Sequence, residues 1–147
     1  MTATAIQLLH VEDDRIQQAL LARQLRGMQD YRFLITAVAS EDDALAAFSE
    51  NGFELVILDY HLSQGDGVNC LRRIRKIDPI VPVIAVSGVA TDEIAAELIS
   101  ADADDYLAKQ TIDSKILAQS VRNVLTRAKA FRATFATHAR SSQAGNG

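Results

Sequence analysis

The sequence predicts an α/β domain in which a parallel β-sheet carries helices on both faces. Two observations lead to this fold class. Short apolar runs alternate with stretches of helical periodicity along most of the 147 residues, and such alternation is typical of a doubly wound sheet. In addition, Leu55–Leu58 and Val83–Val86 are apolar at every position, as expected for strands buried on both faces of a parallel sheet.

Five strands are expected, and the last is the least apolar, so we place it nearer an edge of the sheet. In chain order the predicted strands are Ile6–Val11, Phe33–Val38, Leu55–Asp59, Val83–Val86 and Asp105–Lys109. The strands of such a sheet all end at one edge, and ligands bind there, near the point where the strand order reverses. Polar residues that follow the strands are therefore candidates for a functional site.

Helices are expected in the intervals, because apolar residues recur there at spacings of three and four. The predicted helices cover residues 14–28, 41–50, 68–78, 92–100 and the chain from 113 onward. Ser40 and Thr91 occupy N-cap positions of two of these helices, and Pro79 follows the end of a third.

Composition and charge restrict the classes of protein to which the chain can belong. A hydrophobic content of 48% and a charged content of 23% are ordinary for a globular domain, no run approaches the roughly 20 apolar residues of a membrane span, and we expect no signal peptide. The lone Cys70 excludes an internal disulfide and suggests a cytoplasmic protein. Residues 1–112 carry 9 basic and 18 acidic side chains, which argues against direct nucleic-acid binding.

Chemically useful side chains occur where four of the five predicted strands end. They are Glu12 and Asp13 after the first strand, Asp59 at the end of the third, Ser87 after the fourth, and Lys109 at the end of the fifth. Three carboxylates in one crevice repel one another, and a hard divalent cation relieves that repulsion. An oxygen-only set without histidine or cysteine ligands favours Mg²⁺ over zinc.

These residues, together with Tyr106, resemble in identity and order the motifs of the receiver domains of response regulators. The resemblance covers about residues 5–127 and implies a flavodoxin-like fold, with five strands in the order 2-1-3-4-5 and five helices, the last of which is extended here. It also implies a phospho-acceptor domain of two-component signalling. A sensor histidine kinase or phosphotransfer protein would supply the phosphoryl group, and a downstream protein or output domain would respond.

The resemblance implies roles in phosphoryl transfer for three residues and a role in a switch for a fourth. Asp59 is the expected phosphoacceptor, and Lys109 and Ser87 would contact phosphoryl oxygens, since such transfer depends on positioning and charge neutralisation. Movement of Ser87 toward the phosphoryl group would let Tyr106 change position as part of a switch. Enzymatic activity would be limited to self-catalysed phosphorylation and slow dephosphorylation.

A Mg²⁺ ion is the cofactor that the resemblance implies. It would be bound by Asp13, Asp59 and the backbone carbonyl of His61, with Glu12 acting through a metal-bound water. This assignment agrees with the preference of Mg²⁺ for one or two carboxylates and retained waters.

One position departs from the pattern of the family. Receivers usually follow the lysine with a proline in a cis peptide, whereas this chain has Gln110. A cis bond before a residue other than proline costs about 2.5–4 kcal/mol. We therefore predict a trans peptide between Lys109 and Gln110.

The last predicted helix continues beyond the domain with a heptad pattern of apolar positions. These positions are Leu117, Val121, Val124, Ala128, Phe131, Phe135 and His138. We expect a receiver domain over 1–128 and a helical extension over 129–140 that forms a homodimer with a second copy or packs back on its own domain. A disordered tail is expected over 141–147.

Other functions agree with parts of the pattern. Aspartyl phosphatases of the haloacid-dehalogenase kind also place an Asp after an apolar strand, but they have a second Asp two residues later, where this chain has His61. A degenerate receiver that only binds proteins is favoured by Gln110 and disfavoured by the complete acidic set. The chain is also consistent with one piece of a longer regulator, whose kinase, signal and output the sequence does not identify.

Overall fold

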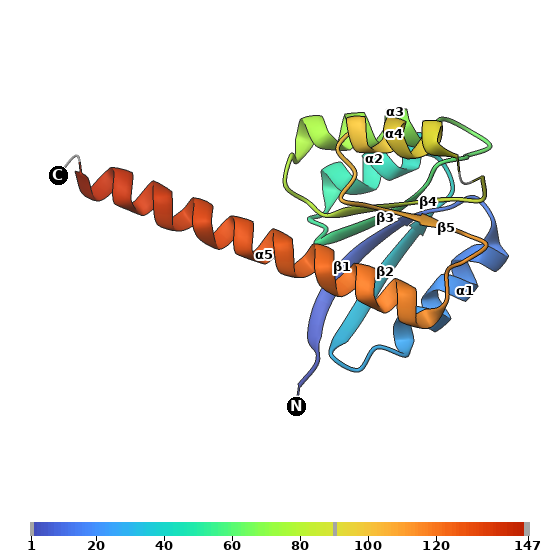
Figure 1. Cartoon of the computed structure of the whole chain (residues 1–147), viewed down its shortest axis with the longest axis horizontal. Coiled ribbons are helices and arrows are strands. Elements are labelled where there is room, and N and C mark those ends of the chain that lie inside the picture. Colours follow the sequence, from blue (N-terminus) through green and yellow to red (C-terminus); the bar gives the residue numbers. More distant parts are fainter. Residues whose placement is uncertain (1, 90, 146–147) are drawn as a thin grey trace.

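The computed structural model of the chain describes residues 2–89 and 91–145, with side chains through residue 136. Within these residues, five parallel strands form one sheet in the order β2-β1-β3-β4-β5, and five helices accompany it (Figure 1). The strands are β1 (Thr4–Val11), β2 (Tyr31–Val38), β3 (Leu55–Asp59), β4 (Val83–Ser87) and β5 (Asp105–Ala108). The helices are α1 (Arg15–Arg26), α2 (Glu41–Glu50), α3 (Gly67–Ile77), α4 (Asp92–Ser100) and α5 (Ser114–Gly145). The predicted fold class and strand order are confirmed.

Helices cover both faces of the sheet, with α2, α3 and α4 on one side and α1 and α5 on the other (Figure 1). Each face has its own apolar core. Leu58 of β3 lies in the same core as Leu71 of α3, whereas the preceding residue, Ile57, lies in the opposite core with Leu25 of α1 and Val121 of α5. Alternate residues of a strand point to opposite faces, which explains why β3 is apolar at every position before its final aspartate.

Element boundaries differ from the prediction by one or two residues. The strands β1 and β2 pair over their whole lengths and begin two residues before the apolar runs, because backbone pairing does not require apolar side chains. Strand β5 ends at Ala108 and not at Lys109. The amide of Lys109 still donates to the carbonyl of Ser87 at 2.8 Å, but the amide of Thr111 then turns back to the carbonyl of Ala108 at 3.1 Å, which closes a turn.

Side-chain caps fix the starts of the helices next to the sheet edge. Ser40 and Thr91 cap α2 and α4 as predicted. Asp14 caps α1, where its carboxylate accepts a hydrogen bond from the amide of Ile16 at 2.8 Å, and Asp66 caps α3. Such caps stabilise a helix by about 1 kcal/mol, and they fix the loops that carry the functional side chains.

Helix α5 continues far beyond the sheet and leaves the body of the molecule (Figure 1). The heptad positions Leu117, Val121 and Val124 are buried in the domain's own core. Phe131 and Phe135 lie past the sheet with 55% and 63% of their surface exposed. The alternative in which the extension packs back on its own domain is therefore wrong for these two residues.

The expected disordered tail over 141–147 needs correction, because α5 continues to Gly145. Residues 141–144 contain no proline, and Ser, Gln and Ala can all continue a helix. Residues 146 and 147, and the side chain of His138, lie outside the described part of the chain, and the division at residue 128 stays a prediction. None of the helices described here, α5 included, combines the length and the apolarity needed to cross a bilayer.

Candidate functional site

Three carboxylates converge at the carboxyl edge of the sheet. Glu12 and Asp13 follow β1, and Asp59 is the last residue of β3, the neighbouring strand. One oxygen from each of the three lies within 4.8 Å of the others. Glu12 and Asp59 are only 3% and 5% exposed, so two of the three charges are withdrawn from water. Sequence reasoning predicted this group correctly, since adjacent parallel strands end at the same edge.

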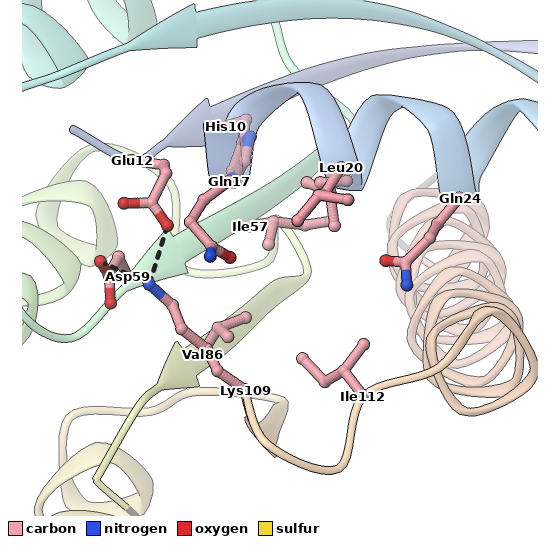
Figure 2. Close-up of a pocket in the computed structure, with 11 residues that line it drawn as sticks. His10, Glu12, Gln17, Leu20, Gln24, Ile57, Asp59, Val86, Lys109 and Ile112 are labelled. Carbon is pink, nitrogen blue, oxygen red and sulfur yellow. Dashed lines mark hydrogen bonds and ion pairs between the residues drawn. The ribbon is translucent and has the colours of Figure 1, made fainter. Parts of the chain in front are cut away.

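Lys109 points into the carboxylate cluster from the end of β5. Its Nζ lies 2.9 Å from Oε1 of Glu12 and 3.1 Å from Oδ2 of Asp59, and Figure 2 shows it reaching toward both carboxylates. Burial lowers the pKa of Lys109, but the hydrogen bond that it donates to Glu12 and the charge of Asp59 outweigh that effect, and the pKa is raised. The ammonium therefore remains charged at the centre of the site.

The surroundings of Glu12 disfavour the ionised form of its carboxyl group. Burial is the largest effect and raises its pKa to about 7, the charge of Asp59 acts in the same direction, and the hydrogen bond from Lys109 opposes both. One ammonium thus compensates three carboxylates only in part. Such a set of hard oxygen donors, with excess negative charge and no nitrogen or sulfur ligand, fits a magnesium ion.

The loop after β3 holds two of the carboxylates through its main chain. The amide of Ser63 donates to Oδ2 of Asp13 at 2.9 Å, and the amide of His61 donates to Oδ1 of Asp59 at 3.3 Å. Hydrogen bonding with Ser63 is the main reason that the pKa of Asp13 is lowered. Sequence reasoning missed Ser63, because its contact with Asp13 joins two loops 50 positions apart in the chain. The side chain of His61 is exposed and packs edge-on against the Tyr60 ring, so its imidazole lies outside the site.

Gly67 lets α3 begin directly beside the end of β3. A Cβ at this position would lie 2.4 Å from the carbonyl oxygen of Asp59 and 2.7 Å from Cα of Tyr60. No side chain fits there without displacing the backbone that carries Asp59. The close approach is visible only in three dimensions.

Ser87 and Tyr106 both contact the loop between β4 and α4. The buried Ser87 hydroxyl donates to the carbonyl of Val89 at 2.9 Å and accepts from its amide at 3.1 Å. The Tyr106 hydroxyl donates to the same carbonyl at 3.3 Å. The two residues predicted to form a switch therefore share one acceptor.

Gln110 adds a third side-chain contact to that loop. Its Nε2 donates to the carbonyl of Gly88, one residue after Ser87. The peptide bond between Lys109 and Gln110 is trans, like the others of the described chain, as predicted from the cost of a cis bond. In place of the proline usual at this position, the chain thus has a side chain that joins the loops after β4 and β5.

A cavity of about 210 Å³ extends from the carboxylate cluster beneath α1. Its lining includes Gln17, Gln24 and the buried imidazole of His10 (Figure 2). Burial, and to a lesser degree the charge of Lys109, lowers the pKa of His10 to about 4. His10 is therefore a neutral buried residue near pH 7.

Comparisons with known proteins agree with this geometry. The family model of the response regulator receiver domain matches residues 8–122. The chain is 33% identical over 104 residues to the transcriptional regulatory protein ZraR of Salmonella typhimurium, which covers 71% of this chain and 23% of that protein. It is 34% identical over 114 residues to a putative NtrX-like response regulator of Rickettsia felis, covering 76% and 23%. The chain thus spans about a quarter of the length of these relatives.

Solved structures show the same arrangement of elements. The signal receiver domain of a putative Luxo repressor protein from Vibrio parahaemolyticus superposes with a TM-score of 0.79 at 28% identity, covering 88% of this chain and 97% of that one. The receiver domain of the sensor histidine kinase PA1611 from Pseudomonas aeruginosa PAO1 superposes with a TM-score of 0.74 at 24% identity, covering 84% and 99%. That receiver domain has a magnesium ion coordinated in its active site cleft.

Proposed function

The chain belongs to the response regulator receiver domains, the phospho-acceptor domains of two-component signalling, and from this premise we propose that Asp59 is its phosphoacceptor. The observation that carries the proposal is the double contact of Lys109 with Asp59 and Glu12, at 3.1 and 2.9 Å. It supports a site in which an ammonium lies directly beside the carboxyl group that would act as the nucleophile. The fold supplies the rest of the pocket from the ends of neighbouring strands.

The chemistry requires little more than positioning. A carboxylate oxygen of Asp59 would attack the phosphorus of a phosphohistidine on the kinase or phosphotransfer protein. The P–O bond forms as the P–N bond breaks, and the imidazole leaves. The ammonium of Lys109 would then contact a phosphoryl oxygen in place of a carboxylate oxygen. It would offset part of the charge of about −1.5 to −2 that the phosphoryl group adds. We propose no reaction beyond this transfer and a slow self-catalysed hydrolysis of the product.

Mg²⁺ is the cofactor that the donor set supports. Asp13, Asp59 and the backbone carbonyl of His61 would bind it, and Glu12 would act through a metal-bound water. When bound, the ion supplies positive charge that orients and neutralises the phosphoryl oxygens. The convergence of three carboxylate oxygens within 4.8 Å around one ammonium supports an excess of negative charge that a cation would relieve.

The shared acceptor at Val89 supports a switch. In the structure the Ser87 hydroxyl is bonded to Val89, and phosphorylation would redirect it to a phosphoryl oxygen. The loop between β4 and α4 would then move toward the site. The carbonyl of Val89 would move with it, and the Tyr106 hydroxyl would lose this acceptor. A local change of charge would thus alter the surface around α4 and β5.

We propose that the chain acts in the cytoplasm, with a sensor histidine kinase or phosphotransfer protein and a downstream protein or output domain as its partners. A homodimer through α5 is a further proposal. It is supported by the exposure of Phe131 and Phe135 on the stripe that begins with buried core residues. In the heptad register Arg127 and Arg132 lie on either side of this stripe. In a parallel pair, Arg127 of one helix would face Arg132 of the other, and their repulsion favours an antiparallel pair.

Phosphorylation by acetyl phosphate tests the central proposal. With Mg²⁺, the wild-type chain should acquire one phosphoryl group that is stable to acid and labile to hydroxylamine, detected as a mass increase on the intact protein. Asp59→Asn should acquire none. Phosphorylation of Asp59→Asn to the wild-type extent would show that another residue is the acceptor.

A further inference from the structure

The loop between β3 and α3, residues 60–66, contacts two carboxylates of the site through main-chain amides. Ser63 holds Asp13, and His61 holds Asp59, at 2.9 and 3.3 Å. A backbone amide can orient a carboxylate only as well as its own loop is fixed. The residue that fixes this loop therefore influences the directions of both carboxylates.

Glu41, the first residue of α2, contacts the far side of this loop. Its Oε2 accepts a hydrogen bond from the amide of Asp66 at 3.1 Å, and its own amide donates to the carbonyl of Gln64 at 3.3 Å. Between these two residues, Gly65 has a φ of +105°, and a Cβ there would lie 2.6 Å from Cβ of Glu41. The turn of the loop and the side chain of Glu41 are thus packed directly against each other.

Glu41 is itself fixed from α3. Its side chain is 8% exposed, and its Oε1 accepts hydrogen bonds from Nδ2 of Asn69 and, at 2.9 Å, from Nη1 of Arg73. Burial raises the pKa of Glu41, but the bonds from Arg73, the Asp66 amide and Asn69 outweigh it, and the pKa is lowered. The carboxylate is therefore ionised near pH 7, with charge-assisted hydrogen bonds on both oxygens, which are about twice as strong as neutral ones.

We propose that Glu41 is a positioning residue for the metal site, which it reaches through the loop and not by direct contact. By anchoring Gln64 and Asp66, it keeps the amides of the loop where they hold Asp13 and Asp59 ready for Mg²⁺. Without this anchor, the loop must lose conformational freedom when the ion binds, and the affinity falls. The inference rests on the proposed function of the site and adds a residue outside it.

The test compares Mg²⁺ binding by wild type, Glu41→Gln and Asp42→Asn. Asp42 is the neighbouring carboxylate, which is exposed and contacts Arg73 at 3.4 Å but not the loop. Mg²⁺ titrations followed by the amide NMR signals of His61 and Ser63 should give a Kd about five- to tenfold higher for Glu41→Gln. The signals of Ser63 and Asp66 should also shift without metal. Asp42→Asn should match wild type in both measurements.

Phosphorylation kinetics separate positioning from a general loss of structure. The Glu41→Gln rate with acetyl phosphate should fall at low Mg²⁺ and return to within about twofold of wild type at saturating Mg²⁺. A wild-type Kd in Glu41→Gln overturns the inference, whereas a wild-type chain that binds no Mg²⁺ overturns the proposed function itself. If Glu41→Gln lacks a cooperative unfolding transition, Gly65→Ala perturbs the same contact from the loop, and an unchanged Kd there overturns the inference equally.

Discussion

Lys109 and Glu12 form an ion pair across the carboxyl edge of the sheet, with Nζ 2.9 Å from Oε1, although they lie 97 positions apart in the chain. Glu12 follows β1, which lies between β2 and the central strand β3, and Lys109 follows β5 at the edge. Two intervening strands, β3 and β4, set the distance between them. The ion pair therefore depends on the correct assembly of these strands, and it is also part of the site.

Replacement of Lys109 by methionine should destabilise the fold as well as prevent efficient phosphorylation. Glu12 and Asp59 would then face each other in a buried position without a cation, which should lower the free energy of unfolding by about 1–3 kcal/mol at pH 8 without Mg²⁺. Urea unfolding measures this change. Lys115→Met, which alters an exposed lysine of α5, is the matched control, and an equal loss in both variants would contradict the proposed role.

His10 should make the fold less stable in acid. Its pKa is lowered from 6.5 to about 4 by burial and by Lys109, so between these values the unfolded chain binds a proton that the folded chain does not. The contribution of the neutral His10 to the free energy of unfolding is thus fully present above pH 6.5 and is lost as the pH falls toward 4.

The contribution of His10 can be isolated by difference. Between pH 7.5 and pH 5, the free energy of unfolding of wild type should fall by about 1–2 kcal/mol more than that of His10→Gln. Glu12 titrates in the same range with the opposite sign, but it is present in both proteins. His61→Gln removes an exposed histidine and should behave as wild type. If His10→Gln keeps the wild-type pH dependence, the buried imidazole is not the cause.

Truncation after Ala128 should remove the proposed homodimer and leave the domain folded. The apolar positions before that point are buried in the domain, whereas Phe131 and Phe135 have no cover from their own body. Sedimentation equilibrium should give a dimer for the full chain and a monomer for the truncated one, with similar unfolding midpoints. A full chain that sediments as a monomer at high concentration would contradict the proposal. The double variant Phe131→Ser and Phe135→Ser keeps the length of the helix and removes the two exposed apolar side chains. A monomer in this variant would show that these side chains form the dimer.

The local sequence contained most of the information about the elements. Apolar runs predicted the strands within two residues, and the caps at Ser40 and Thr91 predicted two helix starts, because a cap depends on residues within three positions of it. The acidic cluster and Asp59 could be placed together as soon as a parallel sheet was inferred. Residues 141–145 were assigned wrongly because their composition favours a loop only weakly and the preceding helix continues into them.

Features that depend on packing between distant segments were decided only by the tertiary structure. These include the contact of Glu41 with the loop after β3, the close approach of Gly67 to Asp59, and the single carbonyl of Val89 that accepts from two hydroxyls. The sequence alone determined which residues could form a phospho-acceptor site and at which edge of the sheet. Their orientations followed from backbone amides and buried neighbours, whose positions exist only once the chain has folded, because a main-chain donor carries no signature of its own in the residue type.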